Sequence, residues 1–114
     1  MFTGIPIHPE AAASLMMAVI ACSDAPLVLL DGELMVVAAS KSFCRAFQIE
    51  ESDVEGREFF GLGGGEWKVP QLGALLKATV AGSVEIKAYE MDLKRPGRET
   101  RRIILNAEKL SYLD

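Results

Sequence analysis

The sequence has few of the residues that metal sites and catalytic centres need. Its 114 residues include one histidine and two cysteines. A structural zinc site takes four Cys or His ligands, and a nucleophilic triad takes a Ser or Cys beside a base. His8 lies near the start of the chain, and Cys22 and Cys44 lack the CxxC spacing. We therefore expect no metal, no catalytic constellation and no enzyme activity.

An excess of positive charge is also lacking. Twelve Lys and Arg residues against sixteen Asp and Glu residues give a net charge of −4, whereas a nucleic-acid surface needs a basic patch. The longest apolar run, 15–22, is far shorter than the ~20 residues of a membrane span, and residues 1–8 have no basic region of a secretory signal. We expect a cytoplasmic protein with neither nucleic acid nor membrane as partner.

The two cysteines allow more than one interpretation. In a chain without a secretory signal, Cys22 and Cys44 are most simply free thiols that pack as small apolar side chains. Sequence alone leaves a disulfide open. A small esterase or redox protein that uses Cys44 is the competing enzyme hypothesis, and it requires a thiol pKa well below the ordinary value.

What is present is the composition of one small globular domain, with 50% apolar and 25% charged residues. We predict a leader over 1–9 and a single domain over 10–114, which consists of a flanking helix, 10–23, and a core, 24–114. Pro9 and Glu10 favour a helix start, and the Ser-Asp-Ala-Pro run at 23–26 ends the helix.

The flanking helix is apolar on most sides. It either packs only on its own domain or also packs against its twin. We expect a homodimer, because burying a large apolar side chain stabilises by about 1.5–3 kcal/mol. The expected interface consists of Leu15, Met16, Val19 and Ile20.

The remaining pattern predicts strands near 27–30, 34–38, 84–94 and 100–110. Asp31-Gly32 between the first two is typical of a hairpin with positive φ in the turn, and Pro96-Gly97 joins the last two. A change of phase near Ala88 predicts a β-bulge. Ser40 and Pro70 favour the starts of helices. The fold class is therefore α+β, an antiparallel sheet with short helices between 40 and 81 on one face.

Two motifs in the second half carry a resemblance to a known family. They are Trp67-x-Val-Pro70-x-Leu-x-x-Leu-Leu76 and Leu105-Asn-Ala107. The chain resembles a PAS domain of the subgroup found in HWE-type bacterial histidine kinases and in chemotaxis methylesterase–methyltransferase fusions. Gly73 and Glu108 stand where that subgroup usually has arginine.

The resemblance implies a non-catalytic sensor and dimerisation module of a bacterial signal-transduction protein, with a histidine kinase or other effector domain as its partner. It also implies a five-stranded sheet whose last strand lies in the centre, and we expect that strand to be missing from this chain. PAS relatives that bind haem use a histidine within the fold, and flavin relatives carry a cysteine motif that is absent here. No cofactor is therefore expected.

The alternative function is a small-molecule receptor domain with an apolar pocket. A filled core is the simpler interpretation of the same residues. Asn106 could face solvent, hold backbone or contact a ligand, and the arginines near 95–102 could form a solvated hairpin tip or contact a small anion or a partner. The Gly-rich run 61–65 lacks the Lys-Ser/Thr ending of a phosphate loop. The candidate pocket residues are Phe43, Phe47, Phe59, Leu76 and Asn106.

Overall fold

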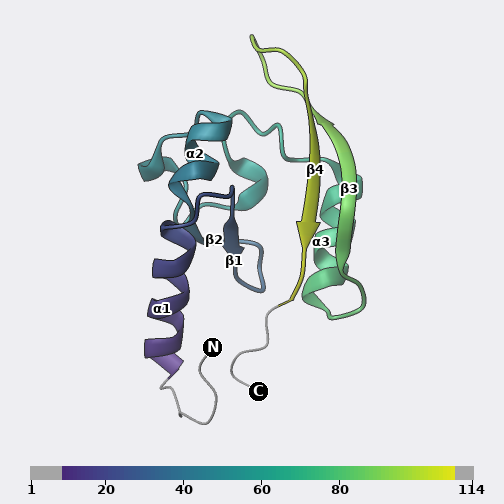
Figure 1. Ribbon diagram of the computed structural model, residues 1–114. Helices are drawn as coiled ribbons and strands as arrows, with labels where there is room; N and C mark the ends of the chain where they lie inside the picture. The colour runs from purple at the N-terminus through teal and green to yellow at the C-terminus, as the bar shows by residue number, and fades with distance from the viewer. Residues whose placement is uncertain (1–8, 110–114) are drawn as a thin grey trace.

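The computed structural model describes residues 9–109, and side chains from Ser14 onward. It is a mixed α+β fold (Figure 1). The predicted leader, apart from Pro9, and the predicted strand end at 110 lie outside the described residues. In chain order the elements are α1 (Pro9–Ala21), β1 (Val28–Leu30), β2 (Val36–Ala39), α2 (Lys41–Phe47), α3 (Pro70–Val80), β3 (Ile86–Leu93) and β4 (Arg101–Ala107).

The four described strands form two antiparallel sheets, β1–β2 and β3–β4, which differs from the single sheet predicted above. In Figure 1, β4 stands between β3 and the β1–β2 hairpin. Paired strands lie about 4.8 Å apart, and the resemblance requires one more strand between the first and the fourth. Because 9–109 contain no such strand, no backbone ladder joins β1 to β4.

The free edge of β2 is used by another segment of the same chain. Glu58 forms an isolated bridge with Met35. The Val36 N–H donates to the Arg57 carbonyl at 2.8 Å, and the Phe59 N–H donates to the Leu34 carbonyl at 3.0 Å. The connection between α2 and α3 therefore extends the β1–β2 hairpin on its outer side.

Although the sheets are separate, they share one hydrophobic core. Buried residues from both hairpins, from α2 and α3 and from the connection between these helices belong to one contiguous cluster. α3 packs on β3, and α1 packs on β1 and β2. Trp67, Leu62, Leu72 and Leu93 are among its most completely buried members.

Ser40 connects three parts of the fold. Its hydroxyl accepts the Phe43 N–H at 3.0 Å, which confirms the predicted cap of α2. The same oxygen accepts the Leu27 N–H at 3.0 Å and donates to the Ala25 carbonyl at 2.9 Å. Ser42 adds a bond to the Asp24 carbonyl. These contacts fix the α1–β1 connection against the start of α2.

The turn between β1 and β2 differs from the predicted one. Positive φ falls on Leu34, at 64°, and not on Gly32. The Asp31 carboxylate accepts the N–H groups of Glu33 and Met35 at 2.8 and 3.0 Å, and Leu34 donates to the Asp31 carbonyl. A turn of this kind followed by one left-handed residue is a common longer hairpin connection.

The β3–β4 hairpin follows the predicted pattern closely. Its register shifts between Ile86 and Tyr89, and Ala88 has a φ of 51°, so the predicted bulge is confirmed. At the other end Arg98 donates to the Arg95 carbonyl across Pro96-Gly97. Gly97 has a φ of 71°, which suits glycine in the third position of this turn.

Candidate functional site

Four aromatic side chains form the centre of the candidate pocket. Phe43 and Phe59 are buried, and Phe47 lies at the edge of the cluster. Their ring centroids lie 6.0, 5.2 and 5.1 Å from Trp67 in the order Phe43, Phe59, Phe47. Such separations are typical of packed aromatic pairs. The rings therefore contact one another and fill the space between α2 and the α2–α3 connection.

Two hollows of the described surface open at the turn between β3 and β4. Phe47 lines the smaller of them at its edge, and neither is lined by Phe43, Phe59 or Leu76. Leu76 is buried in the same core. The filled-core interpretation thus accounts for the candidate pocket residues better than an apolar cavity does. One polar atom does not fit, because the buried Trp67 Nε1 has no acceptor among the described residues.

Asn106 does not belong to this interior. It is exposed on β4, and its Oδ1 accepts the Ala88 N–H at 2.9 Å. Of the three roles open in the sequence, the structure therefore favours backbone support at the bulge. The resemblance motif contains Asn106, but only the bulge opposite it explains what the side chain does.

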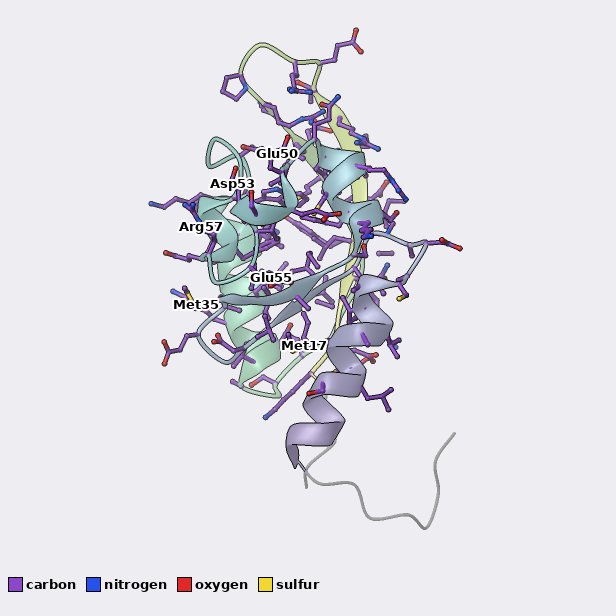
Figure 2. The ribbon with its side chains drawn as sticks, turned by 90° about the vertical axis from the view of Figure 1, so that its left-hand side faces the viewer. Met17, Met35, Glu50, Asp53, Glu55 and Arg57 are labelled. Carbon is purple, nitrogen blue, oxygen red and sulfur yellow. The ribbon has the colours of Figure 1, made fainter. Side chains whose placement is uncertain are left out.

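The predicted dimer interface is divided between two sides of α1. Leu15 and Val19 are 45% and 60% exposed, whereas Met16 and Ile20 are partly buried. Met17, also partly buried, points from α1 toward the β1–β2 hairpin (Figure 2). The helix therefore packs on its own domain with one face and leaves another apolar face exposed.

The two thiols differ in environment. Both are free, Cys22 exposed and Cys44 buried. Burial raises the pKa of the Cys44 thiol, and the negative charges of Glu51 and Glu55 raise it further. Glu55 lies with Glu50 and Asp53 on the segment after α2 (Figure 2). A thiol with a raised pKa is a poor nucleophile near neutral pH, which opposes an esterase or redox role for Cys44.

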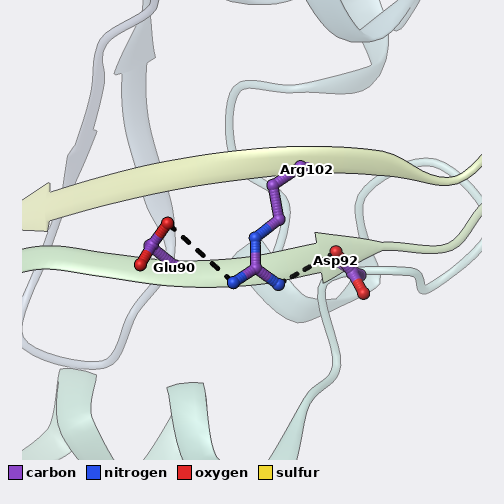
Figure 3. A network of polar contacts seen from close by, with 3 residues as sticks. All are labelled: Glu90, Asp92 and Arg102. Carbon is purple, nitrogen blue, oxygen red and sulfur yellow. Dashed lines mark hydrogen bonds and ion pairs between the residues drawn. The ribbon is translucent and has the colours of Figure 1, made fainter.

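The acidic residues of β3 are paired with an arginine. Arg102 lies across the strand pair from Glu90 and Asp92, with N–O distances of 3.9 and 3.1 Å (Figure 3). All three side chains are about half exposed or more. This arrangement is a surface ion-pair network, and it presents no carboxylate beside an acid–base partner.

The Gly-rich loop binds a carboxylate of its own chain. The Gly64 N–H donates to Glu66 Oε2 at 2.7 Å, and a Cβ on Gly63 would clash with the Glu66 carboxylate. The loop thus uses its close approach for an internal contact, which opposes a phosphate loop. In residues 9–109 no three His, Cys, Asp or Glu side chains gather as a metal ion would require.

Comparison with protein-family models found no match, and comparison with curated proteins found none either. The PAS resemblance therefore stays a prediction that rests on the motifs quoted above. Within the described part of the chain, no helix has both the length and the apolar character to cross a bilayer.

Proposed function

We propose that this chain is a non-catalytic, PAS-type sensor and dimerisation module of a bacterial signal-transduction protein, with a histidine kinase as the parent. The mixed α+β architecture, the motifs at 67–76 and 105–107, and the environment of Cys44 support the proposal. Under it, the chain acts through packing and association, and catalysis belongs to an effector domain.

The observation that carries the proposal is the exposed face of α1. Leu15, Ala18, Val19 and Cys22 are all exposed and follow the i, i+3, i+4, i+7 spacing of one helical face. No charged residue lies between 11 and 23. A second copy presents the same uncharged face, so two α1 helices can pack together without burying a charge.

The connection after α1 gives such a dimer a route to the core. Ser40 and Ser42 hold the backbone of residues 24–27 against α2, and α2 contributes Phe43 to the aromatic cluster. A change of packing in that cluster would shift the start of α2 and, through these hydrogen bonds, the end of α1. Helix shifts of about 1–2 Å at an interface are a common form of signalling.

Sedimentation equilibrium tests the proposal. We expect wild-type protein to form a dimer at micromolar concentration and the Leu15→Glu, Val19→Glu double variant to be monomeric. The control is Ile104→Glu, because Ile104 is 63% exposed but lies on the outer face of β4. It should remain dimeric. A stable wild-type monomer at high micromolar concentration, or equal weakening by both variants, would contradict the proposed interface.

The unpartnered Trp67 Nε1 favours a second candidate, a receptor for a small molecule. A buried donor without an acceptor is costly by about 1–3 kcal/mol. A ligand with a carbonyl or ether oxygen would satisfy it once the rings packed around Trp67 move apart to admit it. Native mass spectrometry of freshly purified protein should then show a bound mass that Trp67→Phe loses. Detection of the dimer with no mass beyond that of two chains would remove this candidate and leave the dimerisation module.

A further inference from the structure

The larger of the two hollows beside the β3–β4 turn has an unusual set of charges. It measures about 530 Å³ and is lined by Ala46, Gln48, Arg95, Arg98, Glu99, Thr100 and Arg101. Three arginines against one glutamate leave a net charge of +2 at its walls, on a chain whose net charge is −4. The hollow therefore forms a local positive site between the β3–β4 turn and the end of α2.

Two of the arginines are held in place by the end of α2. Arg95 Nη1 donates to the Phe47 carbonyl at 3.3 Å and to Gln48 Oε1 at 3.2 Å. Arg101 Nη1 donates to the Ala46 carbonyl, and its guanidinium lies 5.0 Å from the centroid of the Phe47 ring. In each guanidinium one nitrogen, Nη1, donates to a backbone carbonyl. The other nitrogens of the group carry further N–H donors.

The remaining donors of Arg95 and Arg101 make no hydrogen bond to a described residue. Arg95 Nε is buried and makes no hydrogen bond with any described residue. Arg98 lines both this hollow and the adjoining one of about 260 Å³. Its guanidinium makes no ion pair with the described side chains. In contrast, Arg102, one residue beyond Arg101, faces the other side of β4 and pairs with Glu90 and Asp92.

We propose that this hollow binds a small molecule through a phosphate or carboxylate group, with Arg98 and the free edges of Arg95 and Arg101 as donors. Planar guanidinium forks match the oxygen geometry of both groups. The volume lies within the range of small-molecule sites. Thr100 and Gln48 supply uncharged polar groups at the wall, and Glu99 opposes the anion. Occupation would join the tip of the hairpin, through Arg98, to the two arginines already docked on α2.

The test is a titration of the protein followed by the Nε–Hε signals of its arginines in ¹H–¹⁵N NMR spectra. Sodium phosphate and sodium succinate are added separately, with NaCl used to keep the ionic strength constant. We expect saturable shifts of the Arg95 and Arg98 signals with one or both anions, and no shift of the Arg102 signal. The tighter of the two anions identifies the group that the site prefers.

Three variants sharpen this test. Arg98→Gln should lower the affinity for the anion by about tenfold, which is the effect of losing a charge-assisted hydrogen bond. Glu99→Gln should raise this affinity several-fold, because the substitution removes the negative charge that opposes the anion. Arg102→Gln, the matched control, should leave the affinity unchanged.

The proposal is overturned if the shifts rise linearly without saturation, if NaCl alone reproduces them, or if Arg98→Gln titrates like the wild type. Circular dichroism of each variant shows whether the fold is retained, and Arg98→Lys provides a second variant at the same position. Lysine keeps the charge but lacks the planar guanidinium fork, so we expect Arg98→Lys to bind the anion more weakly than the wild type as well. None of these outcomes depends on whether the chain dimerises through α1.

Discussion

The β1–β2 and β3–β4 hairpins are stabilised by different kinds of contact. β1 and β2 are three and four residues long. Ser40 closes the open end of their hairpin through Leu27, and the segment 56–59 bonds to the edge of β2. β3 and β4 are eight and seven residues long. Their pairing is more extensive, since beyond the bulge the strands follow an unbroken register from Tyr89–Leu105 to Leu93–Arg101.

This difference indicates where each hairpin is vulnerable. A short hairpin has too few cross-strand pairs to be stable alone, so β1–β2 depends on a small number of tertiary hydrogen bonds. The longer hairpin distributes its stability over many cross-strand pairs and one half-buried face. Single substitutions should therefore have large effects around β1–β2 and small effects along the outer face of β3–β4.

The largest effect is expected at Ser40. Ser40→Ala leaves the buried N–H group of Phe43, the part-buried N–H group of Leu27 and the Ala25 carbonyl without this partner, and we expect a loss of about 2–4 kcal/mol in the free energy of unfolding. The matched control is Ser42→Ala, which removes one exposed hydrogen bond and should cost less than about 1 kcal/mol. Urea unfolding measures both. Equal losses would show that β1–β2 does not depend on the Ser40 contacts.

A smaller effect is expected at the bulge of β3–β4. Asn106→Ala removes the acceptor of the Ala88 N–H and should cost about 1 kcal/mol. Ala88→Gly should act in the opposite direction, neutral to about 1 kcal/mol stabilising, because glycine adopts positive φ without strain. Thermal unfolding of the two variants gives the comparison. If Asn106→Ala has no effect, the Asn106 contact is not what holds the bulge, and if Ala88→Gly destabilises, positive φ at Ala88 carries no strain that glycine relieves.

The reactivity of the two thiols measures how readily α2 opens, and it requires no substitution that removes a hydrogen bond. We expect alkylation of Cys44 to be at least about tenfold slower than that of Cys22, because Cys44 is buried and its pKa is raised. A raised folded-state pKa contributes stability below the ordinary thiol pKa, and this contribution is lost as pH rises through the folded value. Cys44→Ala should therefore reduce the loss of stability at alkaline pH. Equal labelling rates would show that α2 opens readily.

The smallest effect is expected at Arg102. Its pairs with Glu90 and Asp92 are exposed, and exposed pairs contribute from nothing measurable to about 1 kcal/mol. Arg102→Gln should change the free energy of unfolding by less than about 0.5 kcal/mol, and added salt should reduce the difference. A loss comparable to that of Ser40→Ala would contradict the view that β3–β4 distributes its stability.

Features that depend on a few neighbouring residues were predictable. The cap at Ser40, the start of α3 at Pro70, the turn at Pro96-Gly97 and the bulge near Ala88 all follow from local steric and hydrogen-bonding preferences. The turn at Asp31 was placed correctly but its conformation was wrong. There the Asp31 side chain binds two N–H groups beyond it, and this moves the positive φ to Leu34.

The candidate sites were less predictable, because each depends on which side chains meet. Phe43, Phe59 and Leu76 were expected inside from their apolar character, and they are buried. The sequence could not rank the roles of Asn106, since the Ala88 N–H lies 18 residues away along the chain. The sequence also could not decide the roles of the arginines near 95–102. In the structure two of them bind the end of α2, and another pairs with carboxylates of β3.

The sequence by itself determined the order and the approximate extent of the helices and strands, because capping, turn geometry and apolar periodicity act over a few residues. Tertiary structure decided that the four described strands form two sheets and that Leu15 and Val19 remain exposed while Met16 and Ile20 are partly buried. It also decided that Arg98 has no ion-pair partner among residues 9–109 while Arg95 and Arg101 bind the end of α2. These outcomes depend on contacts between residues far apart in the chain, whose energies no local pattern contains.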